Sequence, residues 1–251
     1  MPIYGIDVSE HQGYIDWEKV KNSGKVDFAI IRAGYGQGNM DKQFTHNAVM
    51  CEQVKIPFGV YWFSYASTPE LAKKEAEFCC DVCDCYNIEY PVCFDFEYDS
   101  DEYVRRKTGK DLTNEERAEI AKAFLDYVID RGYYAMLYTN VDYLNKGFRE
   151  IQPNYGTWLA SWGSFPDGEH AGIWQYTSAG GVDGIKGNVD MNTTSNDYPR
   201  IIATLKKTFQ NETNNDLTKN EKSAIMDAME DKLKVLSDGV NDLKVWLELL
   251  R

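Results

Sequence analysis

The sequence predicts an α/β fold: a (β/α) barrel whose later helices are shortened or missing, followed by a C-terminal coiled-coil-like helix. Short apolar runs alternate with amphipathic stretches from residue 3 to about residue 190. These runs are almost continuously apolar, as parallel strands buried on both faces are. Eight such runs in about 190 residues leave little room for long helices near the end, which favours a compact closed barrel.

The expected elements follow one another along the chain. Strands are predicted at residues 3–8, 28–33, 58–64, 92–97, 133–138, 157–161, 171–176 and 185–189, and helices at 16–23, 41–54, 69–86 and 114–131. Asp16 can cap the first helix at its start, and Gly24 and Gly132 can end the first and the last. An open doubly wound sheet is the alternative, weakened because no glycine-rich phosphate loop follows the first strand.

A change of pattern near the C-terminus predicts two further segments after a barrel of residues 1–207. Residues 208–220 are polar and rich in Asn and Thr, which is typical of a linker. In residues 221–251 apolar side chains recur at steps of three and four, the a/d seam of a coiled coil. We expect this segment to join copies of the chain into a homo-oligomer; a single helix folded back on the barrel is the alternative. The seam consists of Met226, Met229, Leu233, Leu236, Val240, Leu243, Leu247 and Leu250.

Composition narrows the class of protein. The chain has 251 residues, 43% of them hydrophobic, enough for one large domain with an appendage. A net charge of −13, with no basic patch, disfavours nucleic acid as a partner. No apolar run approaches the roughly 20 residues of a transmembrane helix, so no membrane insertion is expected. Because no charged and apolar leader opens the sequence, we expect synthesis in a host cytoplasm without a signal peptide.

Six cysteines, four of them in the run CCDVCDC, raise the question of a metal site. The run falls inside a helical pattern, and no second Cys or His cluster completes a set of four ligands. We therefore expect no metal, and small buried or half-buried thiols instead.

Asp95 and Glu97 lie two residues apart at the end of a predicted strand, in PVCFDFEYDS. Side chains alternate along a strand, so both point to the same face, with Cα atoms roughly 6.6 Å apart. The C-terminal ends of barrel strands carry the active site. Two carboxylates there can divide the work of glycoside cleavage, one protonated to donate to the leaving oxygen and the other ionised. Their mutual repulsion raises the pKa of one of them.

Two more acids are expected on the same rim. Asp7 ends the first predicted strand, and Asp190 follows the last one. The first and last strands of a closed barrel are neighbours, so Asp7 and Asp190 should meet the other two acids. His11 lies in the loop after the first strand, and we expect a hydrogen-bonding role there, because a metal site would need more than one such ligand.

Five ordered blocks resemble glycoside hydrolase family 25, the Chalaropsis-type lysozymes found among phage endolysins and bacterial autolysins. They are GIDVSEHQGYIDW, FAIIRAGYG, IPFGVYWFSYA, FDFE and the closing WQYTS with GIKGNVDMN. The resemblance runs from about Ile3 to Pro199. The chain departs from the family pattern at Cys93–Phe94, where a Trp–Leu pair is frequent, and at LASWGS, where LWxAxY is common. These departures affect packing and a substrate subsite, not the four acids.

The resemblance implies hydrolysis of the β-1,4 bond between N-acetylmuramic acid and N-acetylglucosamine in peptidoglycan, here expected from a Gram-positive wall. It implies that Glu97 is the general acid and that Asp95 assists, as a base or by orienting the acetamido group of the substrate. Asp7 and Asp190 would shape the electrostatic field of the site and hold sugar hydroxyls. No cofactor is implied, because the chemistry is proton transfer and electrostatics. For the sugar-binding cleft we select Tyr61, Tyr138, Trp162, Gln175 and Arg32.

Two other functions stay open at this point. The chain could be a non-catalytic glycan-binding or structural virion protein, which the predicted oligomerisation segment favours. It could also be a barrel hydrolase of another N-acetylated glycan, such as chitin. Retention of all four acids favours an active enzyme, and we expect an endolysin that reaches the cell wall after release from the cytoplasm.

Overall fold

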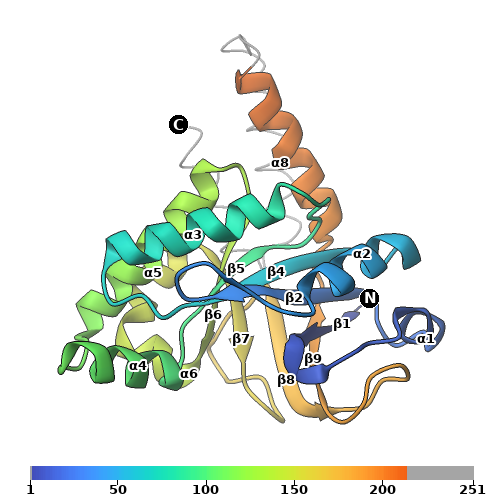
Figure 1. The fold of residues 1–251 in the computed structure, drawn as a ribbon, viewed down its shortest axis with the longest axis horizontal. Helices are drawn as coiled ribbons and strands as arrows, with labels where there is room; N and C mark the ends of the chain where they lie inside the picture. Colours follow the sequence, from blue (N-terminus) through green and yellow to red (C-terminus); the bar gives the residue numbers. More distant parts are fainter. Residues whose placement is uncertain (1, 214–251) are drawn as a thin grey trace.

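The computed structural model describes residues 2–213, so the predicted oligomerisation segment 221–251 and most of the predicted linker lie outside the described residues. One sheet contains all the strands of this part of the chain (Figure 1). The strands are β1 (Ile3–Val8), β2 (Phe28–Tyr35), β3 (Asn39–Met40), β4 (Phe58–Phe63), β5 (Val92–Asp95), β6 (Ala135–Asn140), β7 (Gly156–Ala160), β8 (Ile173–Gly180) and β9 (Val189–Thr194).

The sheet closes into the predicted barrel. Its order is β1-β9-β8-β7-β6-β5-β4-β2-β3, and β1 also pairs with β2, so eight strands form the closed ring. The short strand β3 lies outside the ring and pairs with the C-terminal end of β2. All neighbours within the ring are parallel except β9, which runs antiparallel to both β1 and β8. The α/β barrel class is confirmed, and the open doubly wound sheet is excluded by the closure.

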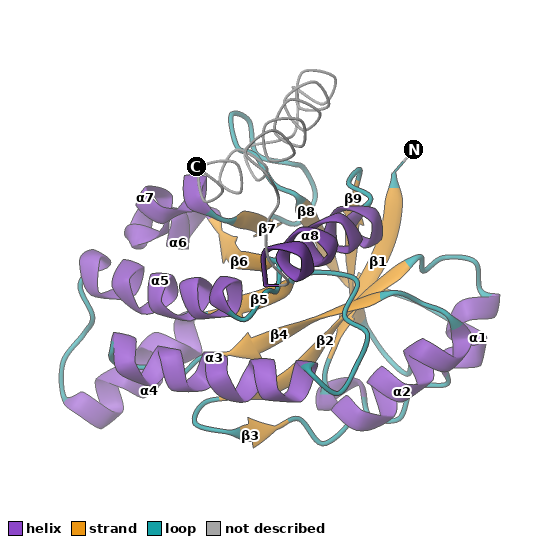
Figure 2. Cartoon of the chain, turned by 90° about the horizontal axis from the view of Figure 1, so that it is seen from above, coloured by secondary structure: helices purple, strands orange, loops and turns teal. Residues whose placement is uncertain are grey.

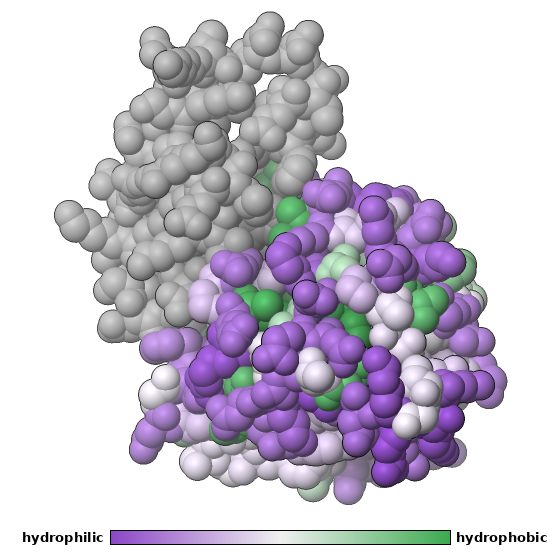
Figure 3. All heavy atoms as spheres, turned by 90° about the vertical axis from the view of Figure 1, so that its left-hand side faces the viewer, coloured by the Kyte–Doolittle hydropathy of each residue, from purple (hydrophilic) through white to green (hydrophobic). Residues whose placement is uncertain are grey.

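Helices surround only part of the ring, as the spacing of the strands predicted. Figure 2 shows the longer helices beside β2, β4, β5 and β6, whereas β8 and β9 are joined by a loop. The face that carries α4 and α5 is mainly hydrophilic, with small scattered apolar areas (Figure 3). The helices are α1 (Trp17–Asn22), α2 (Phe44–Val54), α3 (Pro69–Cys83), α4 (Tyr98–Thr108), α5 (Asn114–Asp130), α6 (Val141–Tyr143), α7 (Arg149–Ile151) and α8 (Tyr198–Thr213), with short turns at Glu10–Gln12, Leu144–Phe148 and Gln152–Asn154. No helix among residues 2–213 combines the length and apolar character needed to span a bilayer.

The last strand differs from its prediction. We expected a strand at 185–189 that ends before Asp190, but β9 begins at Val189 and continues to Thr194. Because β9 is antiparallel, its beginning lies at the same rim as the ends of the parallel strands. Asp190 therefore reaches the expected rim from the start of a strand, not from its end.

Four helices were not predicted: α4, α8 and the three-residue helices α6 and α7. α4 follows directly after β5, which ends at Asp95, so Glu97 is the residue that precedes a helix and not a strand residue. α8 occupies the end of the barrel region and extends to Thr213, into the first residues of the predicted linker. Tyr198, Ile202 and Leu205 of α8 pack against the barrel interior, and Figure 2 shows α8 across that mouth of the barrel.

The interior of the barrel is layered because strand side chains alternate between the inside and the helix layer. Towards α8 the interior is aromatic and apolar, and its middle contains Ile30, Cys93, Met136, Trp158 and Ile173. The opposite end is polar. That polar layer lies at the C-terminal ends of the parallel strands, where a (β/α) barrel carries its site.

The cysteines are packed mainly as thiols in apolar surroundings. Cys51, Cys79, Cys80, Cys83 and Cys93 are buried, whereas Cys85 is exposed, unlike the half-buried position expected for it.

Candidate active site

Asp7 and Asp190 are direct neighbours at the polar end of the barrel. They are opposite residues in the antiparallel pairing of β1 with β9. Burial, followed by the charge of Asp190, raises the pKa of Asp7 to about 8. Burial also raises the pKa of Asp190, although a hydrogen bond with Asp7 works in the opposite direction. The pair therefore holds one proton in common near neutral pH, with Asp7 as the donor.

A buried amide network holds Asp7 in place. Its Oδ2 accepts hydrogen bonds from Gln175 Nε2 at 2.9 Å and from Asn192 Nδ2 at 2.8 Å. Asn192 in turn accepts from Trp158 Nε1 at 2.7 Å. Gln175 and Asn192 are paired residues on β8 and β9, so two adjacent strands present both amides to one carboxyl group.

Asp95 is buried without a full set of partners. It faces the barrel interior at the end of β5, is 6% exposed, and its Oδ1 has no hydrogen-bond partner. Burial first, then the charges of Glu97 and Asp7, raise the pKa of Asp95 far above its usual range, while Arg32 opposes this. A carboxyl group in this setting is held neutral or ready to become so.

Glu97 occupies the more open position of the pair. It is half-buried, and its backbone N–H donates to Ser100 Oγ at 3.1 Å at the start of α4. Burial raises the pKa of Glu97, with further contributions from Asp99 and Asp190, and a hydrogen bond with Tyr138 opposes the rise. Glu97 is thus an acid that retains its proton above the usual range and is still accessible to a ligand.

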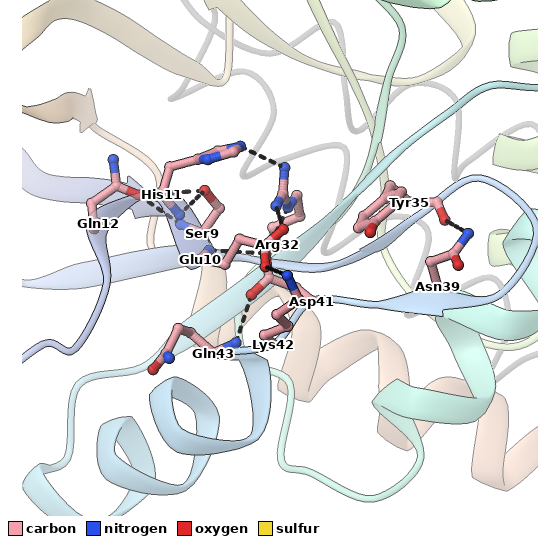
Figure 4. Close-up of polar contacts among 10 residues, drawn as sticks. All are labelled: Ser9, Glu10, His11, Gln12, Arg32, Tyr35, Asn39, Asp41, Lys42 and Gln43. Atoms are coloured by element: carbon pink, nitrogen blue, oxygen red, sulfur yellow. Dashed lines mark hydrogen bonds and ion pairs between the residues drawn. The ribbon is translucent and has the colours of Figure 1, made fainter.

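Arg32 lies beside the acids, but its guanidinium is hydrogen-bonded to other side chains. Figure 4 shows its guanidinium between side chains of the loop after β1 and of the segment before α2. Nε donates to Asp41 Oδ2 at 2.7 Å and Nη2 to Glu10 Oε1 at 3.0 Å, while Nη1 lies 3.3 Å from His11 Nε2. Arg is always a donor, so this contact needs an unprotonated His11 Nε2. His11 has the expected hydrogen-bonding role.

Aromatic side chains border the acids. Tyr138 packs edge-on against Trp158 with ring centroids 4.6 Å apart, and Tyr61 does the same at 6.2 Å. Trp162 is 65% exposed, yet its Nε1 donates to Gln175 Oε1 at 3.3 Å, which ties it to the network around Asp7. A broad indole exposed beside buried acids can support the flat face of a sugar ring.

The structure brings all four predicted acids to one rim and places the five predicted cleft residues around them. Their surroundings differ: Trp162 is open to solvent, whereas Gln175 and Arg32 are buried and hydrogen-bonded to other side chains.

Sequence reasoning missed Asn192 and Trp158. Asn192 lies two residues after Asp190, so the alternation of Val189 and Met191 with two polar residues could have revealed it. Within residues 2–213, His, Cys, Asp and Glu form no group of three or more suited to a metal ion.

Comparison with known proteins decides the family. The pattern described as glycosyl hydrolases family 25 matches residues 6–185. The chain belongs to this family. The family 25 barrel is accordingly a glycoside hydrolase of the lysozyme group.

Individual relatives agree with this assignment. Lysozyme M1 of Streptomyces globisporus is 26% identical over 216 residues, which cover 80% of this chain and 70% of the relative. The bacterial lysozyme of Streptomyces coelicolor has a similar structure, with a TM-score of 0.65 at 25% identity, covering 82% of this chain and 98% of that one. The modular autolysin LytC of Streptococcus pneumoniae, solved with a synthetic peptidoglycan ligand, gives a TM-score of 0.66 at 28% identity. That match covers 76% of this chain but only 46% of LytC.

Proposed function

We propose that this family 25 chain is a muramidase that cleaves the β-1,4 bond between N-acetylmuramic acid and N-acetylglucosamine, acting as an endolysin on a Gram-positive wall. The observation that carries the proposal is the pair formed by buried Asp95 and half-buried Glu97, both with a raised pKa. Such a pair retains a proton to higher pH than two ordinary carboxyl groups would. The lysozyme and autolysin names of its relatives support peptidoglycan as the substrate.

In this proposal Glu97 is the general acid, because it is the more accessible member of the pair. Its proton passes to the glycosidic oxygen as the bond from the muramoyl C1 breaks, and the N-acetylglucosamine end leaves as an alcohol. Water supplies the new oxygen at C1 and returns a proton to the site. Asp95 assists, either by accepting that proton or by orienting the acetamido group for internal attack.

The neighbouring groups would hold the sugar and shape the field. Asp7 and Asp190 hold one proton between them and can both donate to and accept from sugar hydroxyls. Trp162 and Tyr138 would line the cleft on the side of Gln175, with Tyr61 deeper against Trp158. Arg32 would act on the charge of Asp95, since its own donors are committed to Asp41 and Glu10.

The test is clearing of purified Gram-positive walls between pH 4 and pH 8, with product analysis by mass spectrometry on peptidoglycan and on chitin oligomers. Muropeptides with a reducing muramic acid end are expected. No clearing at any pH in this range would count against the muramidase, and faster release of chitin fragments would favour a hydrolase of another N-acetylated glycan.

A further inference from the structure

A cavity lies along the same rim, beyond the acids. It has a volume of about 350 Å³ and is walled by the rings of Tyr35, Tyr65 and Tyr103, which we call the tyrosine pocket. Tyr35 ends β2, Tyr65 follows β4, and Tyr103 lies on α4. The volume is that of a small-ligand site.

The tyrosine pocket shares two charged neighbours with Asp95 and Glu97. The guanidinium of Arg32, which acts on Asp95, lies over the ring of Tyr35 at 5.4 Å from its centroid. On the other side, the charge of Asp99 raises the pKa of both Tyr65 and Glu97, after the larger effect of burial in each case. The start of α4 also joins the two places, because Glu97 precedes this helix and Tyr103 lies on it.

Hydrogen bonds to a buried carboxyl group fix the segments that line the pocket. Buried Glu75 on α3 accepts through Oε1 from Gln37 Nε2 at 3.0 Å and from the backbone N–H of Tyr65 at 3.2 Å. Its Oε2 is buried without a partner. One carboxyl group thus joins the β2–β3 hairpin, which carries Gln37, to the loop that carries Tyr65. Asn39 fixes the same hairpin by donating from Nδ2 to the Tyr35 carbonyl at 3.2 Å (Figure 4).

The charge at the pocket is opposite to the charge of the site beside it. Lys107 lines the pocket and lies over the Tyr103 ring, 5.6 Å from its centroid. It belongs to a basic last turn of α4 that also contains Arg105 and Arg106, on a chain whose net charge is −13. The pocket therefore offers a cation next to aromatic rings, which suits a ligand with both a carboxylate and apolar side chains.

We propose that the tyrosine pocket binds the carboxylate-bearing stem peptide attached to the muramoyl residue of the substrate. This inference rests on the proposed muramidase function. The arrangement of the rings favours a peptide over a further sugar: Tyr35 and Tyr65 meet at 87° and Tyr65 and Tyr103 at 37°, so they form a cup and not a single flat platform.

The first experiment compares hydrolysis of glycan strands that retain their stem peptides with the same strands stripped by an amidase. The full-length chain should have a higher kcat/KM on the peptide-bearing strands. Lys107→Glu and Tyr103→Ala should lower that preference by roughly threefold to tenfold, while the rate on stripped strands stays the same. Arg106→Glu is the matched control: it makes the same charge change on the same helix outside the pocket lining, and it should keep the preference.

A second experiment does not depend on hydrolysis. A free stem pentapeptide with its carboxylates intact, titrated into Glu97→Gln protein and followed by NMR, should bind at Tyr35, Tyr65 and Tyr103 and bind more weakly after Lys107→Glu. No binding, or equal binding with and without Lys107, would overturn the inference. Binding at these residues without any cleavage of walls would instead support the inference and count against the muramidase.

Discussion

Asp7 and Asp190 face each other across the β1–β9 pairing, and their carboxyl groups are joined by a hydrogen bond. Two carboxyl groups in contact cannot both ionise easily, so the pair binds one proton over a broad pH range. Asn192 and Gln175 donate to the same oxygen of Asp7, and their hydrogen bonds are what limits the rise of its pKa. The behaviour of the pair thus depends on residues with no charge of their own.

Replacing Asn192 by Ala should raise the pKa of Asp7 further above about 8, because one of the two hydrogen bonds that favour its ionised form is lost. The buried Trp158 N–H also loses its acceptor, so the free energy of unfolding should fall by about 1–3 kcal/mol. A carboxyl ¹³C NMR titration and urea unfolding measure the two effects. Thr193→Val, one position away on β9, is the control; an unchanged titration of Asp7 in Asn192→Ala would contradict the network described here.

Replacing Glu97 by Gln should lower kcat on peptidoglycan by roughly 10²-fold or more, since the amide cannot donate the proton that the leaving oxygen needs. The thermal unfolding midpoint should change little, because the substitution keeps the size of the side chain. Glu102→Gln on the same helix is the control: Glu102 is exposed and its ion pair with Arg106 at 3.8 Å is weak. Wild-type activity in Glu97→Gln would remove Glu97 from the proposed role.

The position of the four acids at one rim could be predicted from the sequence, because it depends on only a few rules of barrel geometry. Alternation along a strand puts Asp95 on the inner face, and parallel strands bring Asp7 to the same end. Asp190 was placed correctly although its strand was misjudged, because an antiparallel strand that begins at the rim has the same effect as a parallel strand that ends there. A closed barrel tolerates that error.

Two of the missed features, helix α4 and the partners of Arg32, have no periodic signal in the sequence. α4 has only Ser100 and Val104 buried, so its sequence YDSDEYVRRKT shows no apolar stripe, and its start moves Glu97 from the strand to the beginning of a helix. Likewise, the contacts of Arg32 with Asp41 and Glu10 join segments whose approach depends on the tertiary fold. Sequence could nominate Arg32 for the rim but could not show that its donors are occupied.

Replacing Trp162 by Ala should raise KM by roughly tenfold with little change in kcat, because an exposed ring that supports a sugar binds ground state and transition state alike. Stability should be almost unchanged, since Trp162 is 65% exposed. Initial rates over a range of solubilised peptidoglycan concentrations separate KM from kcat. Tyr4→Ala is the control, an exposed tyrosine at the beginning of β1, the opposite end from the acids; equal losses in both variants would mean that exposed aromatics act non-specifically.

The segment 221–251 should make the full-length chain a dimer or higher oligomer, as its a/d pattern predicts. Light scattering on the full chain and on a chain that ends at Asn211 measures this. The shorter chain keeps Ile202 and Leu205, the α8 residues packed on the barrel, so it should fold as a monomer. Equal monomer masses for both chains would exclude self-association through this segment.

Glu75 should make stability depend on pH in a defined window. Burial raises its pKa from 4.5 to about 7, so between these values the folded chain holds a proton at Glu75 that the unfolded chain has lost. The contribution of Glu75 is complete below pH 4.5 and is lost as pH rises to 7, with a total on the order of 3 kcal/mol. Glu75→Gln, which keeps an acceptor for Gln37 and for the Tyr65 N–H, should flatten the fall in unfolding free energy over this window. Glu77→Gln is the control: Glu77 is exposed on the same helix, so this variant should keep the wild-type fall. Urea unfolding at pH 4.5–7 measures the slopes, and identical slopes for wild type and Glu75→Gln would show that Glu75 does not hold that proton.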